Sequence, residues 1–117
     1  QNNLAQISLL LGADTARAQI LARELVTKDP HNPVFLSTYA FALFSKGDNN
    51  NALLTMEKLT DEQRRVPEAA GYYGVILAET GDRIRAAEFL DLAQSGANLL
   101  PEEKALFDRA RRSIAQR

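Results

Sequence analysis

Hydrophobic residues recur along the chain at helical spacing, in blocks separated by Gly, Asp and Pro. The blocks predict helices at about 2–11, 16–27, 33–45, 50–59, 67–80 and 83–94, and a final helix that opens at Pro101. Between Leu59 and Pro67, Thr60 and Gln63 fit a capping box, which predicts one short 3₁₀ or helical piece. The pattern therefore predicts an all-α fold of about seven helices.

Paired helices are expected to be joined by Gly-Asp turns, at Gly47-Asp48 and Gly81-Asp82. In each turn the glycine can adopt a left-handed conformation, and the acid can cap the helix that follows. Asp14 or Thr15 is expected to cap the helix at 16–27 in the same way. The turn at Ser95–Asn98 precedes the final helix.

The same plan repeats every 34 residues. This spacing separates Pro33, Pro67 and Pro101, then Gly47 and Gly81, then Asp14, Asp48 and Asp82, and finally Ala18, Ala52 and Ala86. A period of this size is typical of a helix-turn-helix solenoid, in which each repeat buries its apolar face on its neighbours. We expect one domain, a right-handed α-solenoid of antiparallel helix pairs, with repeats at about 1–32, 33–66 and 67–100 and a capping helix at 101–117.

Composition reduces the classes of function that are expected for this chain. The chain of 117 residues carries 14 basic and 15 acidic side chains and no cysteine, so neither nucleic-acid binding nor a cysteine-based site is expected. No apolar run approaches the roughly 20 residues that span a bilayer. Because the chain starts at Gln1 inside a helical pattern, we expect a soluble segment of a longer protein, whose targeting signal could have been lost upstream. The compartment is not indicated.

The repeated positions resemble the tetratricopeptide repeat (TPR) family, whose unit has 34 residues. The residues that carry the resemblance are Leu9, Ala18, Ala22, Leu25 and Pro30 in the first repeat, Leu36, Tyr39, Ala40, Leu43, Ala52, Met56 and Leu59 in the second, and Ala70, Tyr73, Gly74, Leu77, Ala86, Leu90 and Ala93 in the third. Small residues at Ala40 and Gly74 suit helices that pack at close range. The chain departs from the family in having no Trp, in Arg64 at a closing proline position and in Gln6 at a small position.

In the family that these positions resemble, the first helices line a concave groove that holds a peptide or a helix of another protein. The resemblance places the following residues in such a groove: Leu4, Ile7, Leu10, Ser37, Thr38, Phe41, Phe44, Tyr72, Val75, Glu79, Arg109 and Arg112. Phe41 and Phe44 could instead belong to the core, Phe44 more readily than Phe41. Adjacent helical residues point about 100° apart, so we expect Tyr73 alone to face the core and Tyr72 to face the groove.

Three functions follow from this resemblance. The first is a protein-interaction scaffold that binds a peptide or helix in the groove. The second is a non-catalytic TPR arm of a larger enzyme or of a secretion or assembly factor, and the third is self-association through the N-terminal helix. We expect no catalytic, cofactor or metal site, because no nucleophile, base and orienting group can be assembled and the sole histidine, His31, lies in a loop between prolines.

Overall fold

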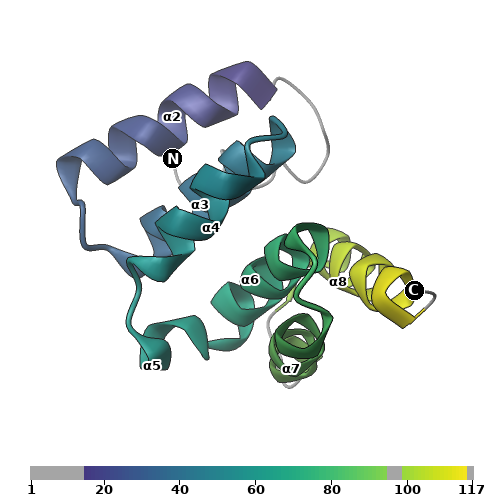
Figure 1. Ribbon diagram of the computed structural model, residues 1–117. Coiled ribbons are helices and arrows are strands. Elements are labelled where there is room, and N and C mark those ends of the chain that lie inside the picture. The colour runs from purple at the N-terminus through teal and green to yellow at the C-terminus, as the bar shows by residue number, and fades with distance from the viewer. Residues whose placement is uncertain (1–14, 95–98, 116–117) are drawn as a thin grey trace. The chain divides into compact units, whose positions relative to one another are not determined.

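The computed structural model describes residues 15–94 and 99–115, and the regular structure in these ranges is helical, without strands. The helices in Figure 1 are α2 (Thr15–Lys28), α3 (Pro33–Ser45), α4 (Asn49–Glu57), α5 (Asp61–Arg64), α6 (Pro67–Thr80), α7 (Arg83–Gln94) and α8 (Pro101–Ala115). The contacts divide the chain into two compact units, Gln1–Leu59 and Thr60–Arg117. Each unit is described by itself.

Within the described ranges, the helices expected from the sequence are confirmed. α3, α6 and α7 have the expected bounds, and α2 and α4 differ from them by one or two residues. The short piece after Leu59 is present as α5. The expected helix at 2–11, the cap from Asp14 and the turn at Ser95–Asn98 lie outside the described residues.

In the first unit, α2 packs against α3, and α3 packs against α4. The Asn32 side chain caps α3 by accepting hydrogen bonds from the Val34 and Phe35 amides at 3.0 and 3.2 Å. Pro33 occupies the first position of α3, where its missing N–H costs nothing. Cap and proline together fix where this helix begins.

The turn between α3 and α4 has the expected chemistry. Gly47 has φ of 92°, in the left-handed region that favours glycine. Asp48 is the N-cap of α4, and its carboxylate accepts from the Asn51 amide at 3.3 Å. Gly81, with φ of 95°, ends α6 in the same way, so the repeated Gly-Asp pair makes the same turn twice.

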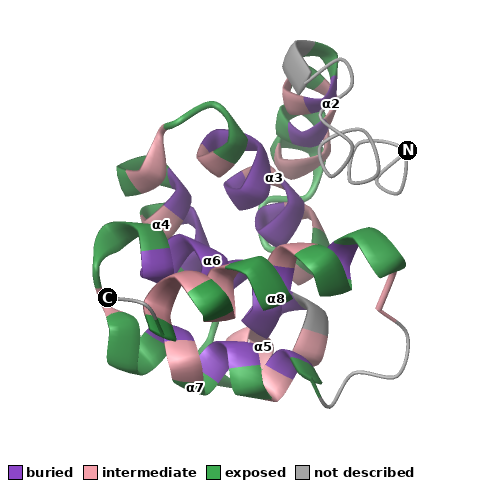
Figure 2. Cartoon of the chain, turned by 90° about the vertical axis from the view of Figure 1, so that its right-hand side faces the viewer, coloured by how far each residue is buried: buried purple, intermediate pink, exposed green. Residues whose placement is uncertain are grey.

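In the second unit, α6 packs against α5, α7 and α8. α6 is buried along most of its length, as Figure 2 shows in purple. The Tyr73 ring meets the Phe89 ring of α7 edge to face, with centroids 4.7 Å apart. A Cβ at Gly74 would lie 2.7 Å from Cγ of Leu90, so the expected close approach at this position is confirmed.

The positions that repeat along the sequence form the core of each unit. Fully or almost fully buried are Ala18, Ala22, Leu36, Ala40, Leu43, Ala52, Met56 and Leu59 in the first unit, and Ala70, Tyr73, Leu77, Ala86, Leu90 and Ala93 in the second. Tyr39 and Leu25 are only half-buried. The 34-residue pattern thus identifies many of the side chains that pack between paired helices, although Phe89, which packs on Tyr73, is not among them.

Candidate functional site

The groove positions of the first unit lie on α3 and are mostly buried. Ser37, Thr38 and Phe41 are 4–6% exposed, and the Thr38 hydroxyl donates to the Val34 carbonyl at 3.0 Å. The Phe41 ring stacks on the Phe44 ring, with centroids 6.1 Å apart and planes 18° apart. Phe44 is half-buried. Of these side chains, Phe44 alone offers a substantial part of its surface to solvent.

In the second unit, α8 packs against α6, and the groove positions Tyr72 and Val75 on α6 are 2% and 4% exposed. The Tyr72 ring meets the Phe107 ring edge to face, with centroids 5.5 Å apart. The expectation that only one of Tyr72 and Tyr73 is buried is therefore wrong. Both are buried because α6 is packed on two sides, with Tyr73 against α7 and Tyr72 against α8.

A buried carboxylate fastens α8 to α6. Glu103 is 1% exposed; one oxygen accepts from the Tyr72 hydroxyl at 2.6 Å and the other from the Leu100 amide at 2.9 Å. The second bond is one half of a capping box, in which the side chain of the third helical residue, Glu103, accepts from the amide of the residue before the helix, Leu100. The sequence predicts Glu103 as an acid in the first turn of the final helix. Its bond to Tyr72 could not be predicted, because the two residues are far apart in the chain.

The remaining groove positions of the second unit are exposed. Glu79 lies near the end of α6, and Arg109 and Arg112 lie on α8. These three side chains are long and charged, and each can contact a partner without repacking of the core. The groove positions Leu4, Ile7 and Leu10 lie outside the described residues.

An open cavity of about 570 Å³ lies between α7 and α8 in the second unit. Its apolar lining includes Ile84, Ala87 and Ile114, and Ile84 is 87% exposed. On its rim, the Arg111 guanidinium donates to the Asp91 carboxylate. The cavity was not foreseen from the sequence, because it depends on where the last turns of α8 lie against α7.

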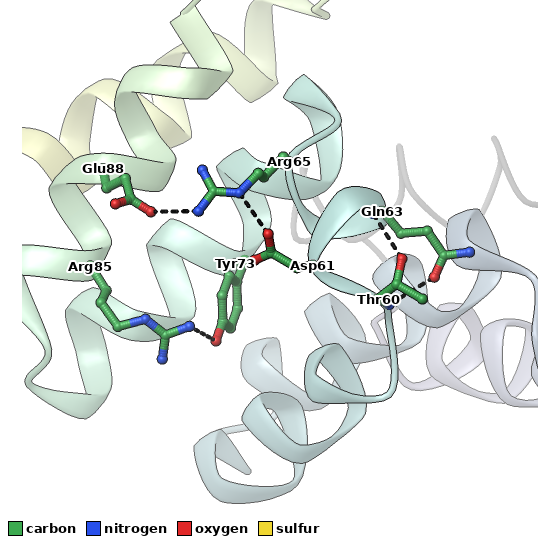
Figure 3. A network of polar contacts seen from close by, with 7 residues as sticks. All are labelled: Thr60, Asp61, Gln63, Arg65, Tyr73, Arg85 and Glu88. Atoms are coloured by element: carbon green, nitrogen blue, oxygen red, sulfur yellow. Dashed lines mark hydrogen bonds and ion pairs between the residues drawn. The ribbon is translucent and has the colours of Figure 1, made fainter.

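Three arginines surround the Tyr73 and Phe89 rings, at the α5, α6 and α7 side of the second unit. Figure 3 shows two of them, Arg65 and Arg85, together with Tyr73. Arg64 and Arg85 lie 5.6 and 5.4 Å from the Tyr73 centroid, and Arg65 lies 5.4 Å from that of Phe89. We call these five residues the arginine–aromatic cluster. Guanidinium groups are attracted to the faces of aromatic rings, so the cluster links α5 and its C-cap to α6 and α7.

Acidic residues hold Arg65 in this cluster. Its Nε donates to Asp61 at 3.0 Å and its Nη2 to Glu88 of α7 at 3.3 Å. The hydrogen bond and charge of Asp61, with the smaller contribution of Glu88, raise the pKa of Arg65 above its ordinary value. The guanidinium of Arg85 donates to the Tyr73 hydroxyl at 2.8 Å. The pairing of Asp61 with Arg65 was readable from their four-residue spacing.

The described part of the chain contains no group of three or more His, Cys, Asp or Glu side chains that could hold a metal ion. His31 is exposed. Within those same residues, no helix combines the length and the apolar character that a membrane crossing requires.

Comparisons with protein-family models, with curated proteins and with solved structures found no match to this chain.

Proposed function

We propose that this chain is a helical repeat domain of the TPR type, which binds a peptide or a helical segment of another protein. The observation that carries the proposal is the 34-residue repeat of helix, Gly-Asp turn and helix, in which α3–α4 and α6–α7 bury equivalent side chains. Domains built from such repeats present extended surfaces to partners. The step from this repeat to protein binding is an analogy of fold.

The proposal includes a right-handed solenoid of antiparallel pairs, which α8 closes as a capping helix. Two side chains support this role for α8. Lys104 and Asp108 stand 34 positions after Ala70 and Gly74, which are small residues buried on α6. Charged side chains at those positions disfavour the close docking of a further helix, so α8 is suited to end the stack.

For binding, we propose in each unit, taken by itself, the groove positions whose side chains remain accessible. They are Phe44 in the first unit and Glu79, Arg109 and Arg112 in the second. Aromatic and arginine side chains are the residue types that most often dominate the energy of interfaces. Thr38, Phe41, Tyr72 and Val75 then act as the support beneath these positions, because they are buried.

Selection from a displayed library of random peptides, on the immobilised 117-residue chain, tests the proposal without knowledge of the partner. We expect selected peptides to lose roughly tenfold or more in affinity for the Phe44→Ala variant and for the Arg109→Ala/Arg112→Ala variant. Leu54→Ala is the matched control, because Leu54 is an exposed apolar residue on the second helix of the same pair.

Two outcomes would contradict the assignment. The first is a set of peptides whose affinity falls with Leu54→Ala and is unaffected by the Phe44 and arginine variants. The second is the failure of repeated selections to enrich any peptide, while the chain remains folded by circular dichroism.

Exposed apolar side chains on α2 favour the second function that the sequence suggested, or self-association through α2 in place of the N-terminal helix. Ile20 is 60% exposed, and Leu21, Leu25 and Val26 are half-buried. A preceding repeat of a longer protein, or a second copy of this chain, could bury this apolar face of α2. Light scattering at micromolar concentration decides between them, since a dimer that Ile20→Gln dissociates supports self-association and a monomer opposes it.

A further inference from the structure

The short helix α5 has an unusual attachment to the rest of the second unit. None of its residues is buried, whereas α6 and α7 are held by buried apolar side chains. Its contacts with α6 and α7 include Arg64, which lies over the Tyr73 ring, and its C-cap Arg65, which pairs with Glu88 and lies over the Phe89 ring. α5 is therefore attached through guanidinium groups and not through an apolar face.

The fold of α5 itself depends on local bonds. The Thr60 amide donates to the Gln63 side chain at 2.9 Å, and the Gln63 amide donates to the Thr60 hydroxyl at 3.1 Å, which completes a capping box (Figure 3). Asp61 and Arg65 add an ion pair at a spacing of four. These bonds lie within the segment 60–65, and a single helical turn is unstable by itself in water, so the turn opens when its contacts with α6 and α7 are broken.

The aromatic rings beneath α5 keep a second cover. Arg85 of α7 lies within 5.4 Å of the Tyr73 centroid and 6.0 Å of the Phe89 centroid, and it is bonded to the Tyr73 hydroxyl. This guanidinium belongs to the helix pair and not to α5. Departure of α5 therefore leaves the Tyr73–Phe89 contact partly covered.

We propose that α5 is a detachable clasp, which leaves α6 and α7 while these helices stay folded. The segment lies where one compact unit ends and the next begins, at Leu59 and Thr60. When it is detached, the seven residues 60–66 act as a linker of up to roughly 24 Å. The clasp gives the chain between Leu59 and Pro67 an attached and a detached state, and it does not depend on the proposed binding function.

Salt is the appropriate way to shift this equilibrium. The pair of Arg65 with Glu88 is partly exposed, with side chains 44% and 53% accessible, and exposed pairs are screened by salt. The pKa of Arg65 is already raised by Asp61, so this guanidinium keeps its charge at ordinary pH. Buried apolar contacts, which hold α6 to α7, are not weakened by sodium chloride.

Amide hydrogen exchange of the whole 117-residue chain, followed by NMR at low salt and in 1 M sodium chloride, tests the proposal. The reporters are the amides of Arg64, Arg65 and Val66, which donate to carbonyls within the segment. Exchange of these reporters at high salt should accelerate by roughly three- to tenfold. The Ala86 amide, which donates to the Asp82 carbonyl at the start of α7, should be unaffected.

Arg65→Met removes the charge and keeps an unbranched apolar side chain. It should accelerate exchange at the same reporters in low salt and abolish most of their salt dependence. Arg111→Met is the matched control, because Arg111 forms a similarly exposed pair with Asp91 of α7 but does not contact α5. The control should leave the Arg64 and Val66 amides unchanged.

Three results would overturn the clasp. One is exchange at the α5 reporters that responds neither to salt nor to Arg65→Met. Another is equal acceleration at the Ala86 amide, which would make α5 part of the same cooperative unit as α7. The third is loss of the helical circular dichroism of the second unit in Arg65→Met, which would make the arginine part of the core structure.

Discussion

At the scale of single residues, close packing around α6 depends on glycine at two positions for different reasons. Gly74 allows the Leu90 side chain to approach, and Gly71 allows the Phe107 ring of α8 to lie against the helix backbone, where a Cβ would be 2.3 Å from ring carbons. The repeat pattern identified Gly74 as a small position. The repeat pattern does not identify Gly71 as a small position, since the need for glycine there comes from the Phe107 ring of α8.

Replacement of Gly71 by alanine is expected to destabilise the chain by about 1–3 kcal/mol, because the added methyl overpacks against Phe107. Helix propensity alone would give the opposite sign, since alanine is favoured over glycine by about 1 kcal/mol in a helix. Urea unfolding measures the difference. In a double-mutant cycle with Phe107→Leu, a smaller cost for Gly71→Ala is expected; a stabilising Gly71→Ala would show that the ring does not lie there.

The hydroxyl of Tyr72 is expected to stabilise the fold because it serves a buried carboxylate. Tyr72→Phe leaves one oxygen of Glu103 without its 2.6 Å partner, and an under-bonded buried polar group costs about 1–3 kcal/mol. Tyr39→Phe is the control, because Tyr39 is half-buried and its hydroxyl makes no hydrogen bond within the described residues. Equal unfolding midpoints for the two variants in urea would contradict the assigned role of Glu103.

At the scale of elements, the ends of the helices were predictable because they depend on local chemistry. Pro33 and Pro67 open α3 and α6, Gly47 and Gly81 supply left-handed turns, and Thr60 with Gln63 closes a capping box. Each signal acts within about four residues. The cover of Tyr72 by α8 joins positions 31 residues apart, and for that reason sequence spacing assigned Tyr72 to the groove.

The left-handed turns allow a test at this scale. Gly81→Ala should destabilise the chain by about 1 kcal/mol, because a Cβ is strained at φ of 95°. No packing effect is involved, since an added Cβ there has no atom within 4 Å. Gly81→Asn should cost less, because asparagine tolerates this conformation better. Thermal unfolding of both variants gives the order, and an alanine variant as stable as the parent would contradict the turn.

At the scale of the whole molecule, the sequence predicts the repeat better than it predicts the binding surface. The period identifies many of the buried side chains between paired helices, because each pair is packed by residues at fixed positions in the repeat, but it misses Ile76 and Phe89, which are 0% and 1% exposed. Exposure of a first-helix position depends on the next element in the chain. Val75 is covered, while Glu79 on the same helix is exposed.

A two-helix unit that recurs along this chain and stacks as a solenoid is the central part of the proposal. A crystal structure of the chain tests it directly, through the rotation and translation that superpose α3–α4 on α6–α7. We expect the same operation, applied once more, to carry α6 onto α8, since Pro33, Pro67 and Pro101 are evenly spaced. A closed bundle, in which no single operation relates these helices, would contradict the claim.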